Sequence, residues 1–385
     1  RSVWCVPWAR QRLLGWLHPL LFPTTMSAAS APAPETSTRP DVVVGVDTHK
    51  HTHMAVALSA NGGWLGSLKL DAQRSGYQEL IRWAAEFGSS PVFAVEGTGC
   101  YGAGLCRALQ TAGLEMVEVN RPDRSTRRRL GKDDTIDAEA AARAFIAGKA
   151  TVIPKAGDDL VEMIRMLKVV KDSATDNRTA ALNQLHAIVV TAPAALRERL
   201  QRLKGKELVE CCSGLRSGEI STPLAAAKMA LRTLARRIQQ LDQELKETVA
   251  QLDRLTRLHC PELRNTYGIG VDISATLVVA VGDNQERLKS EASFAALCGV
   301  NPLPASSGKV VRHRLNRSGN RQANCALHRI VICRLKWHQQ TKEYVERRTA
   351  EGRTIKEIIR CLKRFIAREV FGILRGGPAV RTAAV

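Results

Sequence analysis

The stretch VVVGVDTHK, residues 42–50, decides the fold of the first part of the chain. Its β-branched run predicts a buried strand over 42–47. Two further strand-like segments follow at 53–60 and 64–70, and the Gly62-Gly63 turn between them predicts three antiparallel strands. The first strand ends on Asp47, which is an unusual place for an acid because an unpaired buried charge is strongly disfavoured. The stretch therefore predicts a sheet with a carboxylate at its edge.

Helix and strand signals alternate after these three strands. Helical spacing over 76–88 precedes a short apolar strand at 91–97, and a helix at 102–113 precedes a strand at 115–120. An Ala-rich helix over 134–148 closes the series. This order of elements resembles the topology of the ribonuclease-H-like nuclease fold, so the expected first domain is an α/β ribonuclease-H/resolvase-like domain over 41–155.

Four acids stand at the ends of these elements. Asp47 and Glu96 each end a strand, while Asp134 and Asp137 lie three apart at the start of a helix and therefore share one helical face. Four converging carboxylates repel one another unless divalent cations neutralise them, and oxygen ligands suit Mg²⁺ or Mn²⁺. Other interpretations stay open: Asp134 and Asp137 could serve the helix dipole, Glu96 could cap the next helix, and Asp133 competes with Asp134.

The charge balance favours a polyanionic partner. The chain has 57 Lys and Arg against 37 Asp and Glu, a formal net charge of +20. Such an excess predicts nucleic acid as the partner, the alternative being a merely basic soluble protein. No Cys-x-x-Cys pair occurs among the ten cysteines, which argues against a zinc knuckle. Directly before the acid pair, a basic stretch is predicted to bind phosphates through Arg124, Arg127, Arg128, Arg129 and Lys132.

Residues 156–258 are predicted to form long helices. Over 224–258, apolar residues recur at alternating steps of three and four, a spacing typical of a coiled coil. This spacing predicts helix pairing, either between subunits or within a hairpin, and the alternative is a helix packed on its own domain. The two ends of the sequence are expected to lie outside the folded domains. Residues 1–40 are interpreted as a disordered leader or a translated upstream extension, with Met26 as a plausible start, and residues 379–385 as a tail.

The last region, 259–378, is expected to be a mainly α-helical domain. In TYGIGVDISATLVVAVGD, 266–283, Gly268 and Gly270 lie between two helical stretches, which resembles a helix-hairpin-helix that lets backbone N–H groups approach a phosphate. A plain helical turn is the competing interpretation. No segment of the chain is long and apolar enough to predict a membrane span.

A candidate nucleophile lies in FAALCGVNPLPASSGKVVRHRLNRSGNRQAN, residues 294–324. Positive surroundings favour phosphate binding and lower the pKa of a serine, as a hydroxyl that attacks DNA requires. Ser-Ser-Gly is also a common loop sequence, and Ser306 competes with Ser307 as the nucleophile. The basic residues predicted to bind nucleic acid around Ser307 are Lys309, Arg312, Arg314, Arg317 and Arg321, next to His313.

Several motifs together resemble the insertion-sequence 110 family of transposases over about residues 41–378. The motifs are GVDTHK, VEGTGCYG, KDDTIDA, TYGIGVDISATLV, FAALCGVNP and SSGKVVRHRLNRSGN, in this order. The resemblance implies a DEDD domain with the tetrad Asp47, Glu96, Asp134 and Asp137, followed by a C-terminal transposase domain whose serine matches Ser307.

The resemblance also implies an activity and its partners. The expected protein is a Mg²⁺-dependent recombinase that excises and inserts its own element, with a covalent link between the serine and DNA. Its partners would be the element ends, target DNA and a structured guide RNA that pairs with both. The expected state is a homo-oligomer, a dimer or tetramer. The expected location is the cytoplasm of a bacterium, in association with the nucleoid. The competing hypotheses are a junction-resolving or RNA-cleaving nuclease without a covalent intermediate, and a non-catalytic nucleic-acid-binding remnant.

Overall fold

A computed structural model describes residues 40–119, 133–157, 159–283, 288–306 and 313–376. Most of the expected leader, the C-terminal tail and the basic stretch at 120–132 lie outside these residues. The same holds for Ser307 and the residues that follow it up to Arg312. Within the described residues, no helix combines the length and the hydrophobicity that a membrane crossing requires.

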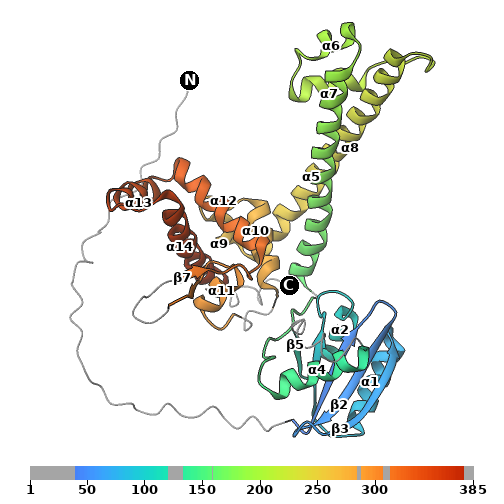
Figure 1. The fold of residues 1–385 in the computed structure, drawn as a ribbon, viewed down its shortest axis with the longest axis vertical. Helices are drawn as coiled ribbons and strands as arrows, with labels where there is room; N and C mark the ends of the chain where they lie inside the picture. Colours follow the sequence, from blue (N-terminus) through green and yellow to red (C-terminus); the bar gives the residue numbers. More distant parts are fainter. Residues whose placement is uncertain (1–39, 120–132, 158, 284–287, 307–312, 377–385) are drawn as a thin grey trace. The chain divides into compact units, whose positions relative to one another are not determined.

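The N-terminal domain is built on one five-stranded mixed sheet (Figure 1). The strands lie in the order β3-β2-β1-β4-β5, with β1, β2 and β3 antiparallel and with β4 and β5 parallel to β1. The three antiparallel strands predicted from the sequence are therefore confirmed. The strands are β1 (Val42–Thr48), β2 (Thr52–Ser59), β3 (Trp64–Asp71), β4 (Pro91–Glu96) and β5 (Met116–Val119).

Helices cover both faces of this sheet because the strands alternate in side-chain direction. Val42, Val44 and Val46 point to the face packed by α1 (Arg74–Ala85) and α2 (Ala103–Thr111). Val43 points to the opposite face, which packs against the alanines of α4 (Asp134–Ile146). Because both faces are covered, β1 is buried along its whole length, as its continuous β-branched run predicts.

Two long helices follow the sheet domain and pack along each other (Figure 1). They are α5 (Leu160–Thr191) and α8 (Pro223–His259), and the short α6 (Ala194–Leu200) and α7 (Gly205–Ser213) lie between them in sequence. The apolar seam predicted over 224–258 lies on α8, buried at Leu231, Ile238, Leu252 and Leu255. The predicted long helices are confirmed. Helix pairing was predicted either between subunits or within a hairpin, and the structure contains the hairpin within one chain.

The C-terminal domain is mainly helical, as expected, and centres on α10 (Val271–Val281), which is buried along most of its length. Its core also receives side chains from both long helices of the hairpin, such as Ile164 and Leu252. Lys168, Lys171 and Arg329 each contact the carboxylate of Asp272, which joins α5, α10 and α12. The remaining elements are α9 (Pro261–Asn265), α11 (Glu291–Leu297), β6 (Pro302–Pro304), β7 (His313–Leu315), α12 (Arg321–Trp337), α13 (Gln339–Ala350) and α14 (Ile355–Gly376).

Candidate functional site

Two of the four predicted acids follow from the register of neighbouring strands. β1 and β4 are parallel, with Val46 paired to Val95, so Asp47 and Glu96 come next on adjacent strands at the same edge. Paired residues of parallel strands point to the same face, and here that face is the one covered by α4. Asp47 is buried and Glu96 half-buried. The hydroxyl of Thr48 donates to the carbonyl oxygen of Glu96 at 2.8 Å, which ties the two strand ends together.

The other two acids reach this edge because α4 lies unusually close to β1. A Cβ atom at Gly45 would stand 1.9 Å from the carbonyl oxygen of Ala138 and 2.6 Å from the backbone nitrogen of Ala142. Glycine on the strand and alanines on the helix therefore allow backbone-to-backbone contact. The first turn of α4 carries Asp134, half-exposed, and Asp137, which is buried. The four acids are called the acidic edge below.

A histidine that the sequence did not single out joins the acidic edge. His49 follows β1, and its Nδ1 lies 3.6 Å from Oδ2 of Asp47 while its Nε2 lies 3.9 Å from Oδ1 of Asp134. One donor atom from each of these three residues falls within 4.8 Å of the others, a spacing suited to holding a divalent cation. Glu96 and Asp137 are outside this group of three but lie on the same face of the sheet or on its covering helix. The only sequence signal for His49 was its position two residues after Asp47.

A second histidine, His53, packs under the turn between β1 and β2 that carries His49. His53 lies on the opposite face of the sheet, where its ring stacks on Tyr77 with centroids 5.8 Å apart. The backbone N–H of His49 donates to the carbonyl oxygen of Thr52 at 3.1 Å and also lies 3.3 Å from Nδ1 of His53. Burial lowers the pKa of His53 below its ordinary value, which favours the neutral ring. His53 therefore packs beneath the turn that carries His49 and does not itself face the acidic edge.

The second candidate site is a hairpin in the C-terminal domain. It consists of the antiparallel strands β6 and β7 together with Ala305 and Ser306, and is called the serine hairpin below. Ser306 is exposed at the end of its first half, whereas Ser307, Lys309 and Arg312 lie outside the described residues. Of the basic residues predicted to bind nucleic acid around Ser307, the three that are described are exposed: Arg314, Arg317 and Arg321.

The base of the serine hairpin is held by close glycine packing and by asparagines. A Cβ at Gly319 would stand 2.2 Å from the backbone nitrogen of Gly299, so the two loops that flank the strands meet where neither has a side chain. The amide of Asn316 donates to Oδ1 of Asn301 at 2.8 Å, and the amide of Asn324 donates to the carbonyl oxygen of Cys298 at 2.7 Å. These asparagine roles were not predictable from the sequence, because each bond joins residues distant in the chain.

The glycines predicted to approach a phosphate lie directly before α10. Gly268 has φ +85°, a left-handed conformation that favours glycine, and Gly270 is the N-cap residue of α10. The preceding helix, α9, has five residues. A phosphate contact at this turn therefore stays a prediction, as does nucleic-acid binding by Arg124, Arg127, Arg128, Arg129 and Lys132, which lie outside the described residues.

Comparison with known proteins identifies both domains. Residues 44–192 match the DEDD domain of IS110-type elements, described as a transposase, and residues 260–346 match the transposase IS116/IS110/IS902 family. The uncharacterized 42 kDa protein of insertion element IS900 from Mycobacterium paratuberculosis is 22% identical over 89% of this chain and 99% of that protein.

A second relative is the uncharacterized 43.6 kDa protein of insertion element IS110 from Streptomyces coelicolor, 28% identical over 148 residues. That match covers 38% of this chain and 36% of the relative, so it spans only about a third of the relative's length. The two family matches do not overlap, and together they extend over more than half of the chain. The chain therefore carries both transposase domains of the IS110 family: the first match includes the sheet domain and α5, and the second begins directly after α8.

Proposed function

We propose that this chain is the DNA recombinase of an insertion sequence, which cuts and rejoins DNA with a metal-binding acidic edge and a serine nucleophile. The observation that carries the proposal is the convergence of donor atoms from Asp47, His49 and Asp134 within 4.8 Å, in a domain that matches a transposase family. Glu96 and Asp137 stand at the same covered face, which supports the tetrad that the resemblance implies. The strand order of the sheet agrees with the proposed ribonuclease-H/resolvase-like fold.

The donor set fits a divalent cation. Carboxylate oxygens suit both Mg²⁺ and Mn²⁺, and an imidazole nitrogen is tolerated better by Mn²⁺. Asp47, Glu96, Asp134 and Asp137 would hold the cation, with His49 as an additional donor. When bound, such a cation polarises a scissile phosphate and neutralises charge that develops on it. The chain's own contribution is rigidity, since Asp47 and Glu96 are fixed by strands and the aspartates of α4 by its contact with Gly45.

The proposed covalent step uses the serine hairpin. The hydroxyl oxygen of Ser307, with Ser306 as the alternative, attacks a DNA phosphorus and forms a phosphoserine ester. The bond from phosphorus to one deoxyribose oxygen breaks, and the proton of the serine ends on that leaving oxygen. Attack by the hydroxyl of another strand reverses the step, joins the DNA and restores the serine. Arg314, Arg317 and Arg321 would neutralise the phosphate charge during this exchange.

The proposal extends to partners that the resemblance implies. Element-end and target DNA are the substrates, and a structured RNA pairs with both as the guide; the net charge of +20 is compatible with two nucleic acids. Pairing of subunits into a dimer or tetramer is supported by an apolar row that stays exposed on α5, at Met163, Met166 and Val170. The turn at Gly268 and Gly270 is proposed as a helix-hairpin-helix-like backbone contact to DNA.

The test is an adduct assay with the full chain, Mn²⁺ or Mg²⁺, RNA from the element's flanks and end-labelled junction DNA. We expect labelled DNA to stay attached to protein on a denaturing gel, and to be lost in Ser307→Ala but retained in Ser306→Ala. Asp47→Asn should abolish cleavage while leaving DNA binding intact. Metal-dependent cleavage without an adduct would replace the proposal by a hydrolytic nuclease, and binding without cleavage would make the chain a non-catalytic remnant.

A further inference from the structure

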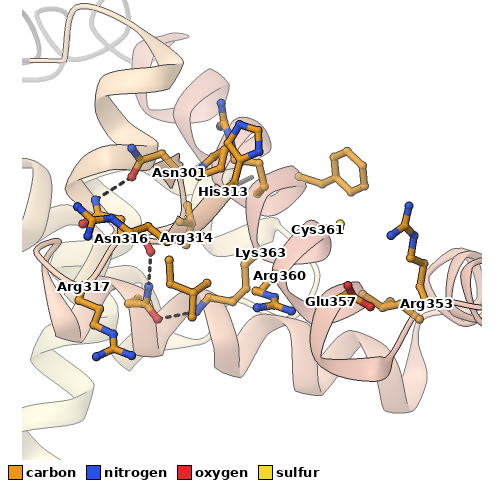
Figure 2. A pocket seen from close by; sticks show the side chains of 18 of the residues that line it. Asn301, His313, Arg314, Asn316, Arg317, Arg353, Glu357, Arg360, Cys361 and Lys363 are labelled. Carbon is orange, nitrogen blue, oxygen red and sulfur yellow. Dashed lines mark hydrogen bonds between the residues drawn. The ribbon is translucent and has the colours of Figure 1, made fainter. Parts of the chain in front are cut away.

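A cavity of about 790 Å³ opens beside the serine hairpin (Figure 2). One wall is the loop from Gly299 to Pro302, and a second is β7 with the residues that follow it. The third wall is α14 and the turn before it, which contribute Arg353, Arg360 and Lys363. Helix α14 begins at Ile355, beyond the segment that matches a transposase family. The cavity therefore contains residues that neither the motifs nor the comparisons connect with a function.

Positive charge dominates the lining of this cavity. Five of its cations form no ion pair with a carboxylate among the described residues: Arg314, Arg317, Arg353, Arg360 and Lys363. The one acid in the lining is Glu357, whose carboxylate accepts bonds from the backbone nitrogen and the hydroxyl of Thr354, both at 2.9 Å. Glu357 is thus engaged in capping the start of α14. The cavity keeps a clear excess of positive charge that an anion would relieve.

Lys363 is the most constrained of these cations. It is half-buried, and its ammonium donates to Oδ1 of Asn324, which is a neutral acceptor. The amide of the same Asn324 donates to the carbonyl oxygens of Cys298 and Gly299, so Lys363 is tied to the loop at the base of the serine hairpin. Burial lowers the pKa of Lys363, as expected for a cation that lacks a counter-charge. A phosphate oxygen in the cavity would supply that counter-charge.

The cations form a row and not a single cluster. Figure 2 shows Arg317 at one end of the cavity, Lys363 and Arg360 in the middle and Arg353 at the other end. A single small anion would need the cations gathered around one point, whereas a row of cations suits successive phosphates of a strand. The arrangement therefore favours a polymer over free phosphate.

We propose that Lys363 and Arg360 of α14 bind the phosphodiester backbone of a DNA strand beside the serine hairpin. This inference rests on the proposed function, because it takes DNA as the strand that the hairpin handles. Phosphate contacts of this kind position a strand without reading its sequence. Lys363 and Arg360 are therefore binding residues, and the cavity beside the serine hairpin would hold the strand whether or not a bond is cut.

The first test measures the salt dependence of DNA binding by the full chain. Binding of labelled duplex DNA is followed by fluorescence anisotropy in EDTA, so no cleavage takes part. Lys363→Gln keeps a donor for Asn324 but removes the charge, and Arg360→Gln removes the second one. Each variant should reduce the slope of log K against log salt by about 0.9, the value of one phosphate contact. The matched control is Lys356→Gln, an exposed lysine of the same helix outside the cavity, which should change the slope much less.

The second test locates the contact directly. Acetylation of Lys363 by a lysine-reactive ester is measured by mass spectrometry with and without saturating DNA, and Lys356 provides the internal reference. DNA should protect Lys363 at least several-fold while Lys356 stays reactive. Full reactivity of Lys363 under saturating DNA overturns the inference. The same holds if the variant that combines Lys363→Gln with Arg360→Gln has the same slope of log K against log salt as Lys356→Gln. Equal protection by inorganic phosphate at the same phosphate concentration would also overturn it, in favour of a free-anion site.

These outcomes separate the inference from the proposed function. If DNA protects Lys363 but Asp47→Asn cleaves normally, the α14 contact stands and the metal mechanism fails. If Asp47→Asn and Ser307→Ala both lose activity while Lys363 is unprotected, the mechanism stands and the α14 contact fails.

Discussion

Replacing Gly45 by alanine should displace α4 and disable the acidic edge. The new methyl group would stand 1.9 Å from the carbonyl oxygen of Ala138, and Cβ atoms essentially never approach closer than 3.0 Å to such atoms. The helix must therefore move outward by at least about 1.1 Å. The atoms in the way belong to backbone, so no side-chain rotation can relieve the contact.

Two consequences of this displacement can be estimated. Overpacking of this kind typically costs about 1–3 kcal/mol of unfolding free energy. A shift of about 1 Å in a catalytic group can cost roughly 10²-fold in rate, and here both Asp134 and Asp137 move with the helix. We therefore expect a folded but less stable protein whose metal-dependent cleavage falls much further than its stability.

The assay combines urea unfolding, DNA cleavage with Mn²⁺, and DNA binding in EDTA for the same variant. Gly99→Ala is the matched control, because a Cβ there meets no described atom within 4 Å and Gly99 follows Glu96 closely in the chain. DNA binding should stay near wild type in both variants, since neither substitution removes a charge. Wild-type stability together with wild-type cleavage in Gly45→Ala would refute the argument that backbone contact places α4.

Three further predictions address the remaining interactions. Asp134→Asn should weaken Mn²⁺ binding by at least about tenfold in calorimetry, about 1.4 kcal/mol, whereas Asp133→Asn should leave it nearly unchanged. Equal effects of the two substitutions would show that Asp134 is wrongly assigned to the tetrad. Because the pKa of His53 is lowered in the fold, this histidine takes up a proton at a higher pH in the unfolded chain than in the folded protein, and the fold should lose stability as the pH falls below about 6.5. Melting temperatures between about pH 7.5 and about pH 5.5 should therefore change less in His53→Phe than in wild type. An unchanged pH dependence would remove His53 as the cause. Asp272→Asn should lower the free energy of urea unfolding by about 3 kcal/mol because Lys168 and Lys171 lose their shared carboxylate in a mostly buried setting. The control Asp242→Asn loses only a surface ion pair and should cost under about 1 kcal/mol. A similar loss in both variants would contradict the special role of Asp272.

Local patterns were sufficient for the main strands and helices. The strand predicted over 42–47 is Val42–Thr48, and the helix predicted over 134–148 is Asp134–Ile146. Such patterns work because side chains alternate along a strand and repeat every 3.6 residues along a helix. The short pair β6 and β7 was not predicted, since three residues are too few to display alternation.

The candidate sites were predictable only in part. Asp47 and Glu96 were expected at one edge because each ends a buried apolar run, and the parallel register of β1 and β4 places them side by side. His49 was missed because a polar residue just after a strand looks like any exposed turn residue. Ser307 and the basic stretch before Asp133 stay predictions, since they lie outside the described residues.

The sequence by itself determined the strands and helices of the N-terminal domain, the acids at their ends, the basic character of the chain and its resemblance to a transposase family. Only the tertiary structure decided that α5 pairs with α8 of the same chain, because an apolar seam does not state which helix covers it. The same holds for the contact between Gly45 and α4, for His49 between two aspartates, and for Lys363 beside the serine hairpin. Each of these joins residues distant in the chain, and such contacts arise only when the whole domain packs.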